Sequence, residues 1–426
     1  MYKKSTLSNN LRIISREFKD RESVAVGVWV GVGGRFEDDA TKGAAHFLEH
    51  ILFRGSLKYP CHEIKGSIEG VGGSLNAFTG EEQTCFYARV PAKHFDLTID
   101  ILCDMVFFPM IQKNDLEKER GIILEEIKMY GDLPQYHVLE MLDAMVWPEH
   151  PLGQNLAGSK ETVGRMTRTD LRDFHRRHYS PDNIVVSVCG NFSHERLEAL
   201  LEAKLANFSS QPKVVCLPFS GLQKKPQSGF FRKKTEQMHL AIGVPSLCAE
   251  HPDSYALAVL NIILGGNMSS RLFDELREKR GLAYSIYSTT RTYADTGMFM
   301  IKAGVDNSKL VEAVGLIAKI LRQLRRGKVS ESEFTRAREY YYGQFVLGLE
   351  DATEHMMWIG ESMVERDRIR TLGEVVSRIN SLTPDDIRRV AADILKEKCF
   401  NLAVVGPIEE AQEKELSRMV EQGLYS

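Results

Sequence analysis

The sequence predicts an α+β protein made of two homologous halves, each a mixed, mostly antiparallel sheet packed with helices on one side. Three observations lead to this prediction. The chain has 426 residues, a length that usually holds more than one domain. Strand-like and helix-like patterns occur in both halves, and a segment rich in Pro, Ser and Gly lies between them. After this segment the order of elements begins again, which indicates a duplicated domain.

Each element of the first half is expected from its hydrophobic pattern. Apolar runs at 11–14 and 24–32 are typical of paired strands in a largely covered sheet. After a polar loop, apolar residues recur first at helical spacing, then in alternation, then at helical spacing again. The further elements, in order, are helices at 44–53 and 61–70, strands at 74–79 and 84–90, helices at 93–108, 115–130, 135–145 and 167–178, a strand at 183–189 and a helix at about 195–206.

The middle of the chain has the composition of a linker. Residues 208–229 contain three prolines and several serines and glycines, without an amphipathic period. We therefore expect a linker at 208–229 between an N-terminal half, 1–207, and a C-terminal half, 230–426.

Two stretches beyond the linker repeat stretches before it. LTPDDI (382–387) resembles MTRTDL (166–171), and VVG (404–406) resembles VCG (188–190), both at an offset of 216 residues. Both places have a helix, then a strand, then a glycine. The period is too long for a solenoid, so the repeat indicates a duplicated domain.

One repeated helix differs between the halves in its chemistry. HFLEHILFRG (46–55) aligns with LAVLNIILGG (257–266). This register places Leu257, Leu260 and Asn261 where the first half has His46, Glu49 and His50. A packing role common to both copies would not need histidines. The difference therefore indicates a functional site in the first half.

Composition and charge argue against several classes of protein. Apolar residues make up 43% and charged residues 27%, as in ordinary globular proteins. With 55 Lys and Arg against 58 Asp and Glu, the formal charge is −3, which argues against a nucleic-acid-binding surface. No apolar run approaches the roughly 18–20 residues that span a bilayer, and no signal peptide is seen. Seven scattered cysteines without a CxxC pair indicate reduced thiols. We expect a cytoplasmic protein that binds neither nucleic acid nor membranes.

The helix at 44–53 carries a candidate metal motif. His46 and His50 are four residues apart, so their side chains share a helix face, and Glu49 falls beside them. Two imidazoles at this spacing can hold one Zn²⁺ and leave the carboxylate near a water on the metal. The alternative is a helix with two structurally satisfied histidines and a surface glutamate.

A third ligand should lie on another element, because open catalytic zinc sites have three protein ligands. The helix at 115–130 offers four glutamates: Glu117, Glu119, Glu125 and Glu126. Glu119 and Glu126 are two turns apart and share a face. Ile122 and Met129 also fall on this face, which indicates that it turns inward. Glu125 points about 100° away. The alternative is a solvated, charged helix.

Four motifs occur in order along nearly the whole chain: GAAHFLEHILFRG (43–55), GGSLNAFTGEEQT (72–84), ERGIILEEI (119–127) and SSRLFDELREKRGLAYSIYS (269–288). In these segments the sequence resembles the M16 metallopeptidase family, which includes pitrilysin, insulin-degrading enzyme and mitochondrial processing peptidase. The HxxEH order of this family inverts HExxH. The resemblance implies the LuxS/MPP-like fold, which consists of two homologous α+β halves.

The resemblance also implies the roles of individual residues in the first half. One zinc ion per chain would have three ligands: His46, His50 and Glu126. Glu49 matches the general base, and Glu119 matches a carboxylate that supports a ligand histidine. Glu126 is preferred to Glu125 because the motif aligns there and because it shares a face with Glu119.

Further residues match substrate contacts of the family. Arg277 and Tyr284 match a paired Arg and Tyr that reach the bound peptide and its oxyanion. The alternative is a surface arginine and a packed tyrosine. The edge strand that pairs with an extended substrate is matched by Asn76, Ala77, Phe78 and Thr79. The alternative there is an ordinary hairpin strand.

The activity implied by the resemblance is that of a zinc-dependent endopeptidase acting on extended or unfolded peptides or N-terminal segments. The alternative is a non-catalytic or partner-dependent subunit like those of the processing peptidases. The intact HxxEH motif, distant glutamate and Arg/Tyr pair favour the enzyme. Larger members of the family carry two such pairs of halves in one chain. The resemblance implies that the substrate is held in an enclosed chamber between two such pairs. We therefore expect a second polypeptide to complete this chamber, giving a homodimer or, alternatively, a heterodimer with a homologous subunit.

Overall fold

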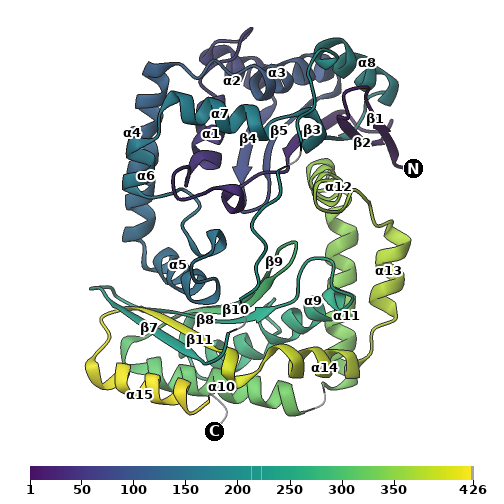
Figure 1. Cartoon of the computed structure of the whole chain (residues 1–426). Helices are drawn as coiled ribbons and strands as arrows, with labels where there is room; N and C mark the ends of the chain where they lie inside the picture. The colour runs from purple at the N-terminus through teal and green to yellow at the C-terminus, as the bar shows by residue number, and fades with distance from the viewer. Residues whose placement is uncertain (213, 222, 328, 424–426) are drawn as a thin grey trace. The chain divides into compact units, whose positions relative to one another are not determined.

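Two mixed β-sheets form the centres of two compact units in the computed structural model (Figure 1). The structure describes residues 1–212, 214–221, 223–327 and 329–423. Residues 213 and 222 of the expected linker, and 328 and 424–426 of the expected C-terminal half, lie outside the described residues. The first unit comprises Met1–Ile127, Asn155–Leu217 and Val346–Arg370, and the second comprises Lys128–Gln154, Pro218–Phe345 and the chain from Thr371 on.

The first sheet has six strands, of which only β2 and β6 are parallel neighbours. Their order across the sheet is β1 (Lys3–Thr6), β2 (Arg12–Glu17), β6 (Ile184–Gly190), β3 (Ser23–Val30), β5 (Thr84–Pro91) and β4 (Ser74–Thr79). Strand β1 was not expected, because its sequence KKST has no apolar alternation. Strand β4 lies at the edge and pairs only with β5.

Within the described residues, the second sheet repeats this topology without a counterpart of β1. Its order is β7 (Gln227–Arg232), β11 (Asn401–Gly406), β8 (Met238–Ser246), β10 (Gly297–Val305) and β9 (Ala283–Thr292), and only β7 and β11 are parallel. The same strand order in both sheets confirms the prediction of two homologous halves. Strand β7 includes the last three residues of the expected linker, from Gln227.

Helices surround both sheets. In the first unit they are α1 (Ala44–Leu52), α2 (Cys61–Glu69), α3 (Phe95–Phe107), α4 (Lys113–Asp132), α6 (Lys160–Arg165), α7 (Arg168–His178), α8 (His194–Leu205) and α12 (Ala352–Arg366). In the second they are α5 (Pro134–Val146), α9 (Ser254–Leu264), α10 (Leu310–Arg326), α11 (Glu331–Gly348), α13 (Leu372–Asn380), α14 (Pro384–Ile394) and α15 (Glu410–Glu421). The chain passes between the units within α4 and again within α11. Among the described residues, no helix is long and apolar enough to cross a membrane.

The main core of each unit lies between its sheet and the helices on one face. In the first unit, Val26 and Val28 of β3 join Phe47 and Leu48 of α1 in this core. In the second unit, α9, α10 and α14 supply most of the equivalent helical side chains. Burial of this apolar surface fixes α1 against the first sheet and leaves its polar residues on the opposite face.

The second face of each sheet is covered by a helix from the other half of the sequence. Helix α12 lies against β3 and β6, and Figure 1 shows it beside β3. Met356 and Ile359 join Trp29 in a second core. Helix α5 lies against β8 and β11 in the same way. Gly27 of β3 makes room for α12, since a Cβ there would lie 2.4 Å from Met356 Sδ. Our expectation of helices on one side only is therefore corrected. The two units also differ from contiguous halves, because each contains a helix taken from the other half.

Candidate metal centre

Gly43 caps the start of helix α1, which is also held by a carboxylate from the preceding loop. Gly43 has a φ of +93°, and a Cβ there would lie 2.7 Å from the carbonyl oxygen of Ala157, so glycine is strongly favoured. The buried carboxylate of Glu37 accepts hydrogen bonds from the backbone N–H groups of Gly43 and Ala45, at 2.9 and 2.7 Å. Two N–H groups that the helix leaves unpaired are thereby satisfied. Sequence reasoning missed Glu37, because it lies in a polar loop with no spacing that ties it to the helix.

The residues of α1 divide between a buried face and a polar face. Its apolar side chains are buried: Ala44, Ala45, Phe47, Leu48, Ile51 and Leu52. His46, Glu49 and His50 lie half-buried on the remaining face. The rings of His46 and His50 lie 4.7 Å apart between centroids, as their spacing of one turn predicts.

Helix α4 supplies the two carboxylates that were expected to share a face. Glu119 is buried and Glu126 is half-buried, whereas Glu125 is exposed. Ile122 and Met129 were expected on the inward face and are instead about half exposed, at 47% and 48%. That expectation was wrong because the inward face is the stripe through Leu116, Glu119 and Ile123, and the other two side chains lie beyond its edge.

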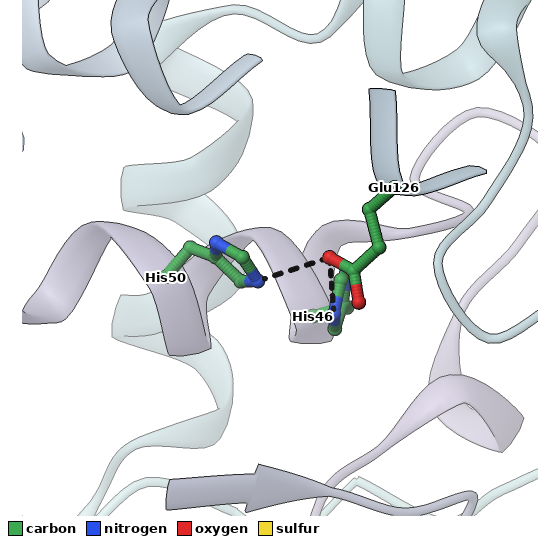
Figure 2. A group of neighbouring side chains, drawn as sticks. All are labelled: His46, His50 and Glu126. Carbon is green, nitrogen blue, oxygen red and sulfur yellow. Dashed lines mark ion pairs between the residues drawn. The ribbon is translucent and has the colours of Figure 1, made fainter. Parts of the chain in front are cut away.

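His46, His50 and Glu126 meet at one point (Figure 2). Each offers one ligand atom, and these three atoms all lie within 4.8 Å of one another. Oε2 of Glu126 is 3.7 Å from Nε2 of His46 and 3.4 Å from Nε2 of His50. The dashed lines of Figure 2 mark these two ion pairs, which converge on the same carboxylate oxygen. Both helices of this cluster belong to the first unit up to Ile127.

The second ring nitrogen of His50 has its own acceptor. Nδ1 of His50 lies 3.0 Å from Oε2 of Glu119, and the other oxygen of Glu119 accepts from Nε of Arg54. This arrangement gives Nδ1 the proton and turns Nε2 of His50 toward Glu126. Sequence reasoning placed Glu119 near a ligand histidine but missed Arg54. The signal was present, since Arg54 follows His50 by four residues.

The two histidines differ in their electrostatics. Burial, together with the charge of His50, lowers the pKa of His46 to about 4, against the opposing effect of Glu126. Burial also lowers the pKa of His50, but the carboxylates of Glu119 and Glu126 outweigh it and raise that pKa to about 9. Burial tends to raise the pKa of Glu119, yet hydrogen bonds from His50 and Arg54 lower it overall, so Glu119 is ionised. The cluster therefore contains carboxylate charge placed to balance a cation.

Glu49 is joined to the end of the edge strand. The hydroxyl of Thr79, the last residue of β4, donates to Oε2 of Glu49 at 2.5 Å. Burial raises the pKa of Glu49, and this hydrogen bond opposes the rise. A carboxylate with a raised pKa beside candidate ligands is typical of a general base. Sequence reasoning named Thr79 only as a substrate-strand residue and missed this contact.

The other residues expected on the substrate strand also lie on β4. Asn76 and Phe78 are exposed, whereas Ala77 packs against the main core. The side-chain oxygen of Asn76 accepts from the backbone N–H of Ala77 at 2.9 Å. Phe78 lies edge-on to Trp29 at 5.7 Å between ring centroids. Strand β4 is therefore an edge strand with one unpaired backbone side, next to the helix that carries Glu49.

Arg277 and Tyr284 lie in the second unit and contact each other. Arg277 belongs to a short π-helix, Phe273–Glu278, and Tyr284 lies near the start of β9. The Arg277 guanidinium carbon lies 4.8 Å from the ring centroid of Phe273 and 5.5 Å from that of Tyr284. Tyr284 is 74% exposed, so it is not the packed tyrosine of the alternative interpretation. The pair is exposed and stacked, as suits a contact with a ligand.

The chemistry of the donor set fits zinc. Two imidazole nitrogens and one carboxylate oxygen form the ligand set of an open zinc site, and a supporting carboxylate on the second nitrogen of a ligand histidine is typical of such sites. Nδ1 of His46 is buried and has no hydrogen-bond partner among the described residues. Among these residues, His46, His50 and Glu126 are the only group of this kind close enough to hold a metal ion.

Comparisons with known proteins agree with this geometry. The family model described as insulinase (peptidase family M16) matches residues 12–160, and the model described as the peptidase M16 inactive domain matches residues 165–341. An uncharacterized zinc protease of Streptomyces coelicolor is 37% identical over 423 residues, covering 97% of this chain and 91% of that protein. The mitochondrial-processing peptidase subunit beta of Bos taurus is 30% identical over 95% of this chain and 84% of its own.

A solved structure supports the fold. A protease from Helicobacter pylori superposes with a TM-score of 0.90 at 22% identity, covering 96% of this chain and all of that one. At this identity the likeness concerns the fold. It agrees with the two-sheet topology described above.

Proposed function

This chain belongs to peptidase family M16, and on that basis we propose that it is a zinc-dependent endopeptidase that hydrolyses extended or unfolded peptides or N-terminal segments. The observation that carries the proposal is the convergence of His46, His50 and Glu126, with ligand atoms within 4.8 Å of one another, beside Glu49. The relative from Streptomyces coelicolor is named a zinc protease, which supports the choice of metal.

In this proposal His46, His50 and Glu126 would hold one zinc ion per chain. When bound, the ion would act as a Lewis acid, which would make water a stronger nucleophile and polarise a carbonyl oxygen. Glu119 holds the ring of His50 through Nδ1 and is itself held by Arg54. These contacts fix the direction of the ligand nitrogen before any substrate arrives.

Glu49 is proposed as the general base. It removes a proton from the attacking water as the carbon–oxygen bond forms, and it delivers that proton to the leaving amine as the carbon–nitrogen bond breaks. Its raised pKa makes the carboxylate a better proton acceptor than an exposed glutamate. Because the same carboxylate accepts the proton from water and then donates it to the amine, no separate general acid is needed.

The substrate backbone is proposed to add to the open edge of β4. Main-chain hydrogen bonds from alternate residues of the segment Asn76, Ala77, Phe78 and Thr79, those whose backbone groups point away from β5, would hold an extended peptide with little demand on its sequence. Arg277 and Tyr284 are proposed, from the family motif alone, as further contacts to the peptide and its oxyanion. An arginine and a phenol together supply the donors that a developing negative charge needs.

The test uses the full-length purified protein. Zinc content is measured by mass spectrometry, and cleavage of a mixed peptide library is followed by product analysis with and without a chelator. We expect one zinc per chain, cleavage that the chelator abolishes, and a loss of about 10²-fold or more in Glu49→Gln. Glu126→Gln should lose zinc, whereas the matched control Glu125→Gln, changed at the neighbouring exposed glutamate, should keep it. Absence of zinc, or equal cleavage by Glu49→Gln, would contradict the proposal.

A partner-dependent subunit is the second candidate. It is favoured by the relative that is named a subunit of a processing peptidase and by the family model described as an inactive domain. Because this chain has its own copy of Arg277 and Tyr284, we propose a homodimer first. Light scattering of the purified chain, combined with the cleavage assay, decides between an active homodimer and a subunit that needs a homologous partner. Activity of the chain alone supports the homodimer, and activity that appears only after a homologous subunit is added supports the heterodimer.

A further inference from the structure

One residue joins the edge of the first sheet directly to Glu49. Thr79 ends β4, and its hydroxyl donates to Oε2 of Glu49 at 2.5 Å. This is the distance of a hydrogen bond from a hydroxyl to a charged carboxylate, which is stronger than a bond between neutral groups. Among the described residues, every hydrogen bond of the Glu49 carboxylate comes from Thr79, through its hydroxyl and its backbone N–H.

The direction of the Thr79 side chain is fixed by the strand. Alternate residues of β4 face opposite sides, and Leu75 and Ala77 pack against the main core that also holds α1. Thr79 continues this series by two residues. Phe78 points to the other face, where it meets Trp29. The alternation therefore places the Thr79 hydroxyl on the side of α1.

The residue opposite Thr79 does not share this contact. Thr79 pairs with Thr84 of β5 across the hairpin. The hydroxyl of Thr84 is buried and donates to the backbone carbonyl of Val32 at 2.8 Å. The two threonines of this cross-strand pair therefore differ in the acceptor of their hydroxyl groups, which is Glu49 for Thr79 and the Val32 carbonyl for Thr84.

We propose that Thr79 is a positioning residue whose hydroxyl holds one oxygen of the Glu49 carboxylate and so leaves the other oxygen turned to accept the proton of the attacking water. This inference rests on the proposed function. It assigns Thr79 a role distinct from pairing with the substrate backbone. A carboxylate on a flexible side chain that is held at one oxygen loses most of its freedom to turn away.

The first experiment separates positioning from substrate pairing. Thr79→Val keeps the β-branched shape and removes the hydroxyl, Thr79→Ser keeps the hydroxyl, and Thr84→Val is the matched control. With a peptide that the wild type cleaves, we expect Thr79→Val to lower kcat by about tenfold to a hundredfold while KM and zinc content stay within about twofold. Thr79→Ser should stay within about threefold of wild type. An unchanged kcat in Thr79→Val, a change in KM alone, or an equal loss in Thr84→Val would overturn the inference.

The second experiment does not depend on catalysis. Denaturant unfolding midpoints of wild type, Thr79→Val, Glu49→Ala and the double variant form a double-mutant cycle on the metal-free protein, because each single variant removes one partner of the hydrogen bond. We expect shifts that are clearly not additive, because the two side chains share one hydrogen bond. Additive shifts in a protein that cleaves peptides overturn this inference alone. A wild type that cleaves no peptide overturns the proposed function, and this inference with it.

Discussion

Helices α1 and α9 are two copies of one element, and they differ in what they carry. In α9, Leu257 and Leu260 are buried in the second core, and the Asn261 side-chain oxygen accepts from the hydroxyl of Ser288 at 2.7 Å. In α1 the same positions hold His46, Glu49 and His50, all of them half-buried. Helix α1 contacts the edge strand β4, and α9 contacts β9, the strand at the same edge of the second sheet.

The fold therefore does not require polar residues at these positions. In the second unit, the residues aligned with His46 and Glu49 are Leu257 and Leu260, and both belong to the core. In the first unit they need partners from elsewhere, because buried polar groups are costly when unpaired. Glu119, Glu126 and Thr79 supply those partners from α4 and β4. The stability of the first unit therefore does not explain why α1 carries His46, Glu49 and His50.

The largest expected effect comes from converting the first copy into the second. The triple variant His46→Leu, Glu49→Leu, His50→Asn gives α1 the residues of α9. We expect zinc to be lost and peptide cleavage to fall by more than about 10⁴-fold, since both the metal site and the base are removed. The melting temperature should stay level or rise, because Leu has no unpaired polar atom to bury. Zinc analysis, cleavage assays and calorimetry test this, and retained zinc would contradict the assignment of the ligands.

Single substitutions at one aligned position should separate function from stability. Leu260 is fully buried, so Leu260→Ala should lower the free energy of unfolding by about 2–5 kcal/mol. Glu49→Ala, at the same position in the first copy, should change it by less than about 1 kcal/mol while abolishing cleavage. Urea unfolding of both variants checks the pair. Comparable destabilisation by Glu49→Ala would mean that Glu49 is a structural residue.

Acid should affect the first unit more than the second at another aligned position. Burial lowers the pKa of His178 in α7 to about 4, and the same position in α14 is Ile394. The unfolded histidine takes up a proton as the pH falls below about 6.5, whereas the folded one stays neutral until about 4. The stability that it contributes is complete above about pH 6.5 and is lost as the pH falls toward 4.

We expect this histidine to cost about 2 kcal/mol of stability between pH 7 and pH 5. His178→Leu should remove that part of the pH dependence. Hydrogen exchange at β6 and at β11, measured at both pH values, shows which sheet opens. Equal acid sensitivity of wild type and His178→Leu would contradict the prediction.

The smallest expected effect concerns two strand glycines, Gly27 of β3 beneath α12 and Gly243 of β8 beneath α5. A Cβ at Gly27 would lie 2.4 Å from Met356 Sδ and 2.9 Å from Trp29 Nε1, whereas a Cβ at Gly243 would lie no closer than 2.9 Å to Leu142. Gly27→Ala should cost about 1–3 kcal/mol, and Gly243→Ala about 1 kcal/mol or less. Thermal unfolding of the two variants measures the difference. A larger cost at Gly243 would show that α5 packs more tightly than α12.

Much of the candidate site could be predicted from local sequence. The spacing of His46 and His50 fixes their common face, and the two turns between Glu119 and Glu126 fix theirs. The resemblance selected Glu126 rather than Glu125, and the structure places Glu126 beside both histidines. The prediction that Ile122 and Met129 face inward was wrong because a shared helical face is broad and only part of it is covered.

Contacts between distant elements could not be predicted. Thr79 reaches α1 through the tertiary fold, and Glu37 reaches it through the irregular loop that precedes the helix; no period in the sequence connects either residue to α1. Arg54 could have been found, since it follows His50 at helical spacing. Helix α12 reads as an ordinary amphipathic helix of the second half. Only the packing of Met356 on Trp29 shows that it belongs to the first sheet.

Helix α12 of the second half covers the first sheet, and α5 of the first half covers the second sheet. This arrangement has a consequence for synthesis on the ribosome. A nascent chain that has emerged up to Leu217 contains every strand of the first sheet but lacks α12, so the face around Trp29 has nothing to cover it. The first unit can be completed only after Arg366 has emerged, when most of the second unit has also been made. The first unit therefore cannot finish folding on the ribosome before most of the second unit is made. Until then the nascent chain exposes an apolar sheet face of the kind that chaperones bind, and its two units must mature almost together.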